Sequence, residues 1–235
     1  VVAAHTPLEF HSIGIFISSF HMALFFFLSG YFVDYAKYPD FRSFLRKKAR
    51  TLLVPYFFFA SVSYLYFLLR YHFGDADYYR DLNPYQVLLG IFYSAGTREW
   101  MDFNLPLWFL TCLFVVELLM YAIRRLSPGR AWIALALLVC SAAGYADSLL
   151  NPYKLPWSVD VALTAVVFYG MGYLLKPLAD RLLAQPVLFR LGLALALLLL
   201  NALFTVQRVN VNMKPFGHYY DFYSAAVCGI GFCLL

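Results

Sequence analysis

The sequence predicts an all-α protein, a polytopic bundle of transmembrane helices, on three observations. Hydrophobic residues make up 63% of the 235 residues and charged residues only 13%, about half of what a soluble domain carries. Apolar runs reach the roughly 20 residues that a helix needs to cross a bilayer. Basic residues gather in alternate connections between these runs, as the positive-inside rule requires. A bundle of spans folds as one unit, so we expect a single membrane-embedded domain over residues 1–235.

About seven apolar runs are long enough, or nearly long enough, to span a membrane. They are 12–33, 51–69, 105–123, 131–147, 157–175, 187–206 and 219–235. Residues 1–4 resemble the end of an earlier span and the last run is incomplete, so we expect a fragment truncated at both ends. The stretch 84–95 is apolar but short, which indicates an interfacial or re-entrant helix.

Loop charge predicts the orientation. The connections 34–50, 124–130 and 176–190 hold twelve of the eighteen lysines and arginines, and we expect them on the cytoplasmic side. This alternation works only if 84–95 does not cross. The net charge of +5 then reflects the basic cytoplasmic connections and does not indicate binding to nucleic acid. We expect a multi-pass protein of the cell (inner) membrane, in contact with membrane lipids.

His21 lies near the middle of the run 12–33, where a titratable ring is costly. It shares one helix face with Gly14, Ser18 and Ser29. Two interpretations stand equally: a packing seam in which His21 is hydrogen-bonded to a neighbour, or the wall of a reaction chamber.

Three other polar residues fall within apolar runs. For Glu117, pairing with a basic residue on another helix is favoured over a functional role. Asp160 fits the first turn of a helix as well as it fits a site. Asn201 is expected to link helices by hydrogen bonds.

The four cysteines, Cys112, Cys140, Cys228 and Cys233, lie in apolar runs without CxxC spacing. We expect small buried hydrophobes and neither disulfides nor metal ligands. No metal site is predicted.

Arg46, Lys47 and Arg50 precede a span at three- and four-residue spacing and form one basic face on a helix. Charge alone favours anchoring to anionic lipids. The functional alternative is a site for the phosphates of a nucleotide cofactor.

Four segments together resemble the membrane-bound acyltransferase 3 family, in particular its fucose 4-O-acetylase-like branch. They are "FHMALFFFLSGYF", "FLRKKARTLLVPYFF", "NLPLWFLTCLF" and "LPWSVDVALTAVVFYGMGYLL". The segments stand in the family's order and cover most of the chain.

The resemblance implies about ten helices in the full-length protein and transfer of an acyl group, usually acetyl, from cytoplasmic acetyl-CoA or another acyl-CoA. The acceptor is a hydroxyl of a carbohydrate or glycolipid at the outer side. His5 takes the place of the family's essential histidine. Lys47-x-x-Arg50, with Arg46 adjacent, takes the place of its R-x-x-R pair for the CoA phosphates.

From this resemblance we hypothesise that neutral His5 is the general base on the acceptor hydroxyl. Glu9, one turn along, would orient it, and His21 would line the path of the pantetheine arm. The acceptor sugar and the choice between acetyl and succinyl stay open. Two rival classes are a transporter or flippase of a glycan or small solute, and a non-catalytic membrane scaffold or sensor.

Overall fold

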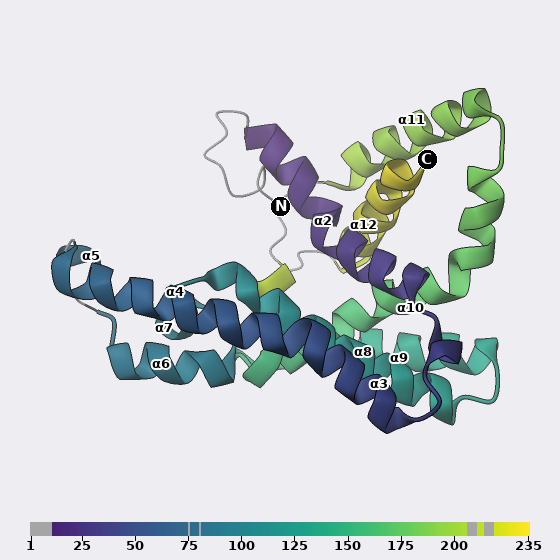
Figure 1. The fold of residues 1–235 in the computed structure, drawn as a ribbon. Coiled ribbons are helices and arrows are strands. Elements are labelled where there is room, and N and C mark those ends of the chain that lie inside the picture. Colours follow the sequence, from purple (N-terminus) through teal and green to yellow (C-terminus); the bar gives the residue numbers. More distant parts are fainter. Residues whose placement is uncertain (1–10, 75, 80, 206–210, 214–218) are drawn as a thin grey trace. The chain divides into compact units, whose positions relative to one another are not determined.

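The computed structural model describes residues 11–74, 76–79, 81–205, 211–213 and 219–235. These residues form helices and connecting turns without a β-strand among them, so the all-α prediction is confirmed (Figure 1). The elements are α2 (His11–Phe32), η1 (Tyr35–Lys37), α3 (Phe41–Lys48), η2 (Ala49–Leu53), α4 (Val54–Phe73), α5 (Ala76–Tyr79), α6 (Pro84–Tyr93), α7 (Arg98–Met101), η3 (Leu105–Leu107), α8 (Trp108–Leu126), α9 (Arg130–Leu150), η4 (Pro156–Ser158), α10 (Val159–Leu183), α11 (Val187–Phe204), η5 (Val211–Met213) and α12 (Tyr219–Leu234).

Six helices among the described residues are long and apolar enough to cross a membrane, which makes this a multi-pass membrane protein. They are Gly14–Phe32, Phe41–Phe73, Leu105–Leu126, Arg130–Leu150, Pro156–Leu183 and Val187–Phe204. Each overlaps a predicted span. The seventh predicted run forms α12, a helix of 16 residues.

The apolar stretch 84–95 forms α6, a helix of ten residues. At 1.5 Å per residue it is about 15 Å long, half the thickness of the hydrocarbon core. Asn83 caps its start by accepting a hydrogen bond from the Tyr85 backbone N–H. Ser94 ends it in the left-handed conformation, with φ 53°. The prediction that this stretch is too short to cross is confirmed.

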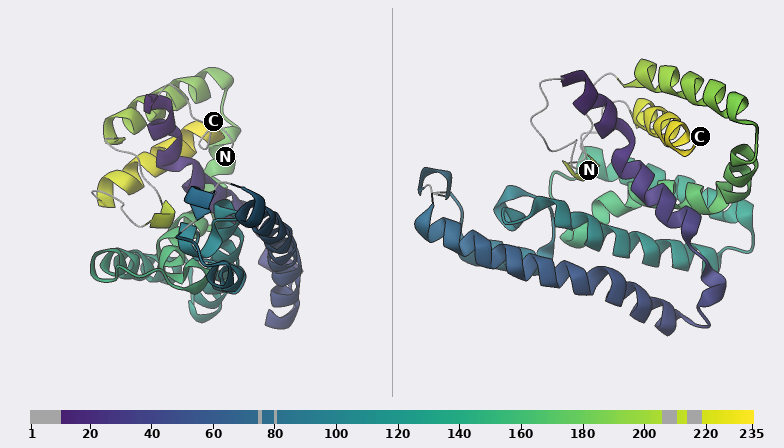
Figure 2. Two further views of the ribbon diagram at one scale, coloured as in Figure 1. Left: turned by 90° about the vertical axis from the view of Figure 1, so that its left-hand side faces the viewer. Right: turned by 45° about the horizontal axis from the view of Figure 1, so that its top comes forward.

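The chain divides into two compact units. In the first, built from residues 1–33, 127–148 and 164–235, α11 packs along α12 and α12 along α2 (Figure 2). α2 and α10 approach closely: a Cβ added at Gly30 would lie 1.9 Å from the Tyr169 carbonyl oxygen, and one at Gly172 would lie 2.0 Å from that of Phe27. Small residues at such crossings let two backbones meet in a membrane.

Asn201 connects three helices of the first unit. Its fully buried side-chain amide donates hydrogen bonds to the Ala225 carbonyl oxygen on α12, at 2.6 Å, and to the Ser19 hydroxyl on α2, at 3.2 Å. An unpaired amide would be costly here, so these bonds hold α11 in register. The prediction of an interhelical link at Asn201 is confirmed.

The second unit comprises residues 34–126 and 149–163. Its main element is one continuous helix of 33 residues, Phe41–Phe73, made of α3, η2 and α4 (Figures 1 and 2). It begins ten residues before the predicted span 51–69 because Asp40 and Ser43 form a capping box: the Asp40 carboxylate accepts from the Ser43 backbone N–H at 2.6 Å. The helix is about 50 Å long, so its basic end extends beyond a hydrocarbon core of about 30 Å.

All four cysteines are free. Cys112 and Cys228 are buried as predicted, whereas Cys140 is half-buried and Cys233 is exposed.

Candidate functional site

Arg46, Lys47 and Arg50, here called the cation cluster, lie on the second and third turns of the long helix, at the junction of α3 and η2. All three side chains are exposed. Together with Arg42, Ser43 and Asp40 they line a cavity of about 470 Å³, a size typical of small-molecule sites. The structure therefore brings the three predicted residues to one concave surface. Arg42, one turn before Arg46, is an additional lining cation that the same helical spacing could have indicated.

The cation cluster carries charge that no described residue neutralises. None of its three side chains forms an ion pair or a hydrogen bond within the described part of the chain. Asp40 is the one acid that lines the cavity. Its carboxylate accepts a hydrogen bond from the Ser43 backbone N–H, and this bond is the main reason that the pKa of Asp40 lies below its usual value. The cavity is thus suited to an anionic ligand.

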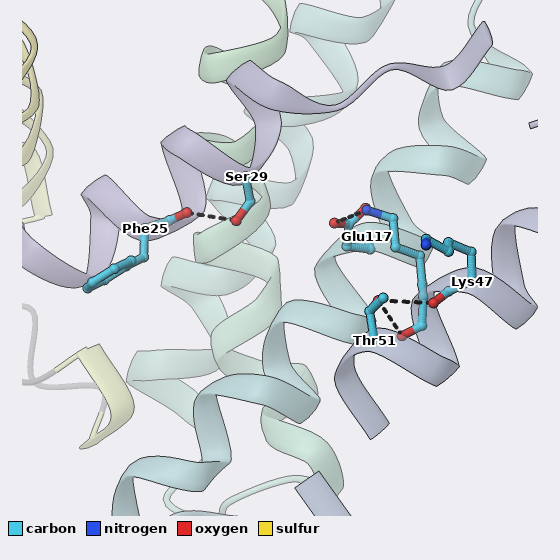
Figure 3. A network of polar contacts seen from close by, with 6 residues as sticks. Phe25, Ser29, Lys47, Thr51 and Glu117 are labelled. Atoms are coloured by element: carbon cyan, nitrogen blue, oxygen red, sulfur yellow. Dashed lines mark hydrogen bonds and ion pairs between the residues drawn. The ribbon is translucent and has the colours of Figure 1, made fainter. Parts of the chain in front are cut away.

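A π-helical turn forms η2, directly beside the cation cluster. The Val54 backbone N–H reaches back five residues to the Ala49 carbonyl oxygen. Thr51 supports this turn: its hydroxyl donates to the carbonyl oxygens of Lys47, at 2.9 Å, and Lys48, at 3.2 Å (Figure 3). A widened turn just before Pro55 relieves the clash that its ring would make in a regular helix. Single π turns of this kind occur frequently at functional sites.

Lys48 differs from its neighbours because it is paired. Its ammonium nitrogen donates a hydrogen bond of 2.6 Å to Glu117 Oε1 on α8 (Figure 3). The pair is largely buried, with the side chains 16% and 4% exposed. The favoured interpretation of Glu117, pairing with a basic residue on another helix, is confirmed. The pair fixes the C-terminal end of α3 to α8, which also packs against η2.

His21 lies on α2, in the first unit. Its half-buried ring donates a 3.0 Å hydrogen bond from Nδ1 to the Ile17 carbonyl oxygen of the same helix.

The predicted seam on α2 is only partly used. Ser18 is buried, but nothing lies within 4 Å of a Cβ added at Gly14. The buried side chains further along are Ser19, Phe20, Ala23, Phe26 and Phe27. Helix packing therefore uses a face offset from that of His21, and the roles of the histidine stay predictions.

His5 and Glu9 lie outside the described residues, so their predicted roles stay predictions as well.

A second polar cluster lies in the second unit; the position of Asp160 in a first helical turn was one of its two predicted interpretations, whereas its pairing was not predicted. Asp160 in the first turn of α10 pairs with Lys154 at 3.6 Å, and these side chains are 0% and 13% exposed. Trp157 and Ser158 beside them adopt left-handed backbone conformations, with φ 57° and 51°. The Trp157 indole N–H donates to the Phe92 carbonyl oxygen at 2.7 Å. These contacts connect the start of α10 to the end of α6, and Asp160 thus has a structural partner.

Among the described residues, no three His, Cys, Asp or Glu side chains are grouped so as to hold a metal ion.

Comparison with known proteins gives one match. The sequence model of a protein family described as an acyltransferase domain, acyltransferase 3, matches residues 1–235. No curated protein and no solved structure matches the chain.

Proposed function

The chain belongs to the acyltransferase 3 family, and from this premise we propose that it moves an acetyl group from acetyl-CoA to a hydroxyl of a carbohydrate or glycolipid. That it is a multi-pass membrane acyltransferase follows from the family match and the six spanning helices. The identities of the donor, the acyl group and the acceptor are proposals. The place of this protein among the family's fucose 4-O-acetylase-like members is also a proposal.

The observation that carries the donor assignment is the cation cluster. Coenzyme A brings three phosphate groups, and Arg46, Lys47 and Arg50 present three cations with no partner among the described residues around a cavity of about 470 Å³. Hydrogen bonds between such cations and phosphate oxygens are about twice as strong as neutral ones. Lipid anchoring alone needs neither the cavity nor the π turn.

The connection 34–50 that carries the cluster is also the most basic one in the sequence. We place it on the cytoplasmic side of the inner membrane, where acyl-CoA is available, and the acceptor on the outer side.

The proposed chemistry is direct acyl transfer. Neutral His5 takes the proton of the acceptor hydroxyl as that oxygen attacks the thioester carbonyl. The carbon–sulfur bond breaks, the CoA thiolate leaves, and the imidazolium returns its proton to the thiolate. Glu9 orients the His5 ring, and His21 lines the path of the donor's pantetheine arm.

The experiment supplies isotope-labelled acetyl-CoA to the cytoplasmic side of membrane vesicles that contain the protein. Mass spectrometry of the glycans should show an increment of one labelled acetyl group. A His5→Ala variant that inserts normally should lose it. Wild-type turnover by that variant would remove the proposed base.

The same vesicles separate the transporter alternative. Transfer from added acetyl-CoA should continue when an uncoupler collapses the ion gradients. A glycan phenotype that disappears with the gradient and brings no labelled acetyl group would instead indicate a transporter or flippase.

A further inference from the structure

An aromatic groove lies next to the cation cluster and is not explained by phosphate binding. It has a volume of about 500 Å³ and is lined by Tyr35, Tyr38, Phe41 and Tyr121, together with Arg124 and Arg125 at the end of α8. The size is typical of a site for a small molecule. Its residues come from the same connection as the cation cluster and from the C-terminal end of α8.

The aromatic groove is built on a packed support. Phe44, fully buried, stacks on Tyr121 with ring centroids 4.6 Å apart and an interplanar angle of 27°. Tyr38 packs edge-on against Phe44 with the ring centroids 5.1 Å apart, and the ring centroids of Phe41 and Tyr121 are 5.3 Å apart. Rings that are already packed against one another lose little conformational entropy when a flat ligand binds, so the groove is preorganised.

The groove and the cation-lined cavity adjoin, because Asp40 lines both. Its carboxylate is held by the Ser43 backbone N–H at 2.6 Å. One ligand can therefore contact the aromatic rings at one end and the cation cluster at the other.

The groove has cations of its own. The Arg124 guanidinium lies 4.8 Å from the centroid of the Tyr35 ring. Arg125 is exposed and pairs with no described residue. An arginine beside an aromatic wall offers both stacking and bidentate contact with a phosphate.

We propose that the aromatic groove binds the adenine ring of the acyl-CoA donor, while Arg125 and the cation cluster hold its phosphates. This inference rests on the proposed function, in which acyl-CoA is the donor. A flat purine, a ribose and three phosphates match a row of rings followed by cations. The groove thus confers selectivity for a nucleotide-bearing thioester over the bare pantetheine thioester.

The test measures binding of adenosine 3′,5′-bisphosphate to the whole protein in nanodiscs of phosphatidylcholine. Phe41→Ala should weaken binding at least about fivefold, as expected for loss of one base–aromatic stack, and Phe41→Trp should restore it. Arg125→Gln should weaken it several-fold, less so at high salt. The matched controls are Phe58→Ala, at a residue that is 62% exposed compared with 49% for Phe41, and Lys37→Gln. Unchanged affinity in Phe41→Ala and Arg125→Gln would overturn the proposal.

Kinetics with two donors separate this inference from the proposed function. Phe41→Ala should raise KM for acetyl-CoA about as much as it weakens binding, and should leave KM for S-acetylpantetheine unchanged. If the wild type transfers no acetyl group from acetyl-CoA, the proposed function fails. If it does, and only the cation-cluster variants change KM for acetyl-CoA, the groove proposal alone fails. Variants that alter only retention on phosphatidylglycerol vesicles would assign the groove to lipid headgroups and overturn the proposal.

Discussion

Lys48 Nζ lies 2.6 Å from Glu117 Oε1, so the charge of Lys48 is neutralised by an ion pair. Lys47 beside it forms no ion pair within the described residues. The pair joins the π turn to α8, and each partner is largely buried. Two adjacent lysines therefore have different roles, one that holds the helix in place and one that faces a cavity.

Glu117→Gln should destabilise the protein by about 3 kcal/mol, because Lys48 would keep a largely buried charge without its partner. Thermal unfolding in detergent measures this as a lower Tm. The double variant Lys48→Met with Glu117→Leu should recover most of the loss, since it removes both charges. A Glu117→Gln protein with unchanged Tm and no acyl transfer would indicate a catalytic carboxylate instead.

Asp160→Asn should lower the Tm by several degrees, because it removes the acid from a buried pair with Lys154. The matched control is Asp34→Asn, which breaks an exposed pair with Lys37 at 3.8 Å and should change the Tm little. Equal effects of the two substitutions would show that burial does not set the contribution of Asp160.

Asp40→Ala should lower the Tm by removing the N-cap of α3. The Ser43 N–H lowers the pKa of Asp40 in the folded state, so the charged carboxylate stabilises the helix at pH values above its unfolded pKa of about 3.9. The Tm difference between wild type and Asp40→Ala should therefore be constant near pH 6 and shrink as the pH falls below about 4. A difference that grows in acid would contradict this cap.

Hydropathy and loop charge were enough to predict the spanning helices, because a helix in lipid must satisfy its own backbone. The same reasoning predicted the hydrogen-bonding role of Asn201, since an amide among leucines needs partners on other helices. The helix Phe41–Phe73 started earlier than predicted because the capping box at Asp40 outweighs the change in hydropathy at residue 51.

The spacing of Arg46, Lys47 and Arg50 placed them on one face, but the aromatic groove beside their cavity depends on residues of α8. Neither the Lys48–Glu117 pair, 69 residues apart, nor the left-handed Trp157 and Ser158 leaves a local pattern in the sequence. Long-range contacts of this kind come from packing, which periodicity does not encode.

The affinity for the acyl donor tests the central claim most directly. Lys47→Gln with Arg50→Gln should raise KM for acetyl-CoA about a hundredfold or more and leave kcat nearly unchanged, since each of the two lost phosphate contacts is a charge-assisted hydrogen bond of about 1.5–3 kcal/mol. The control, Lys37→Gln with Arg181→Gln, also removes two exposed positive charges and should keep the wild-type KM. Unchanged KM in the first variant, at full membrane insertion, would contradict a donor site at the cation cluster and leave these residues as lipid anchors.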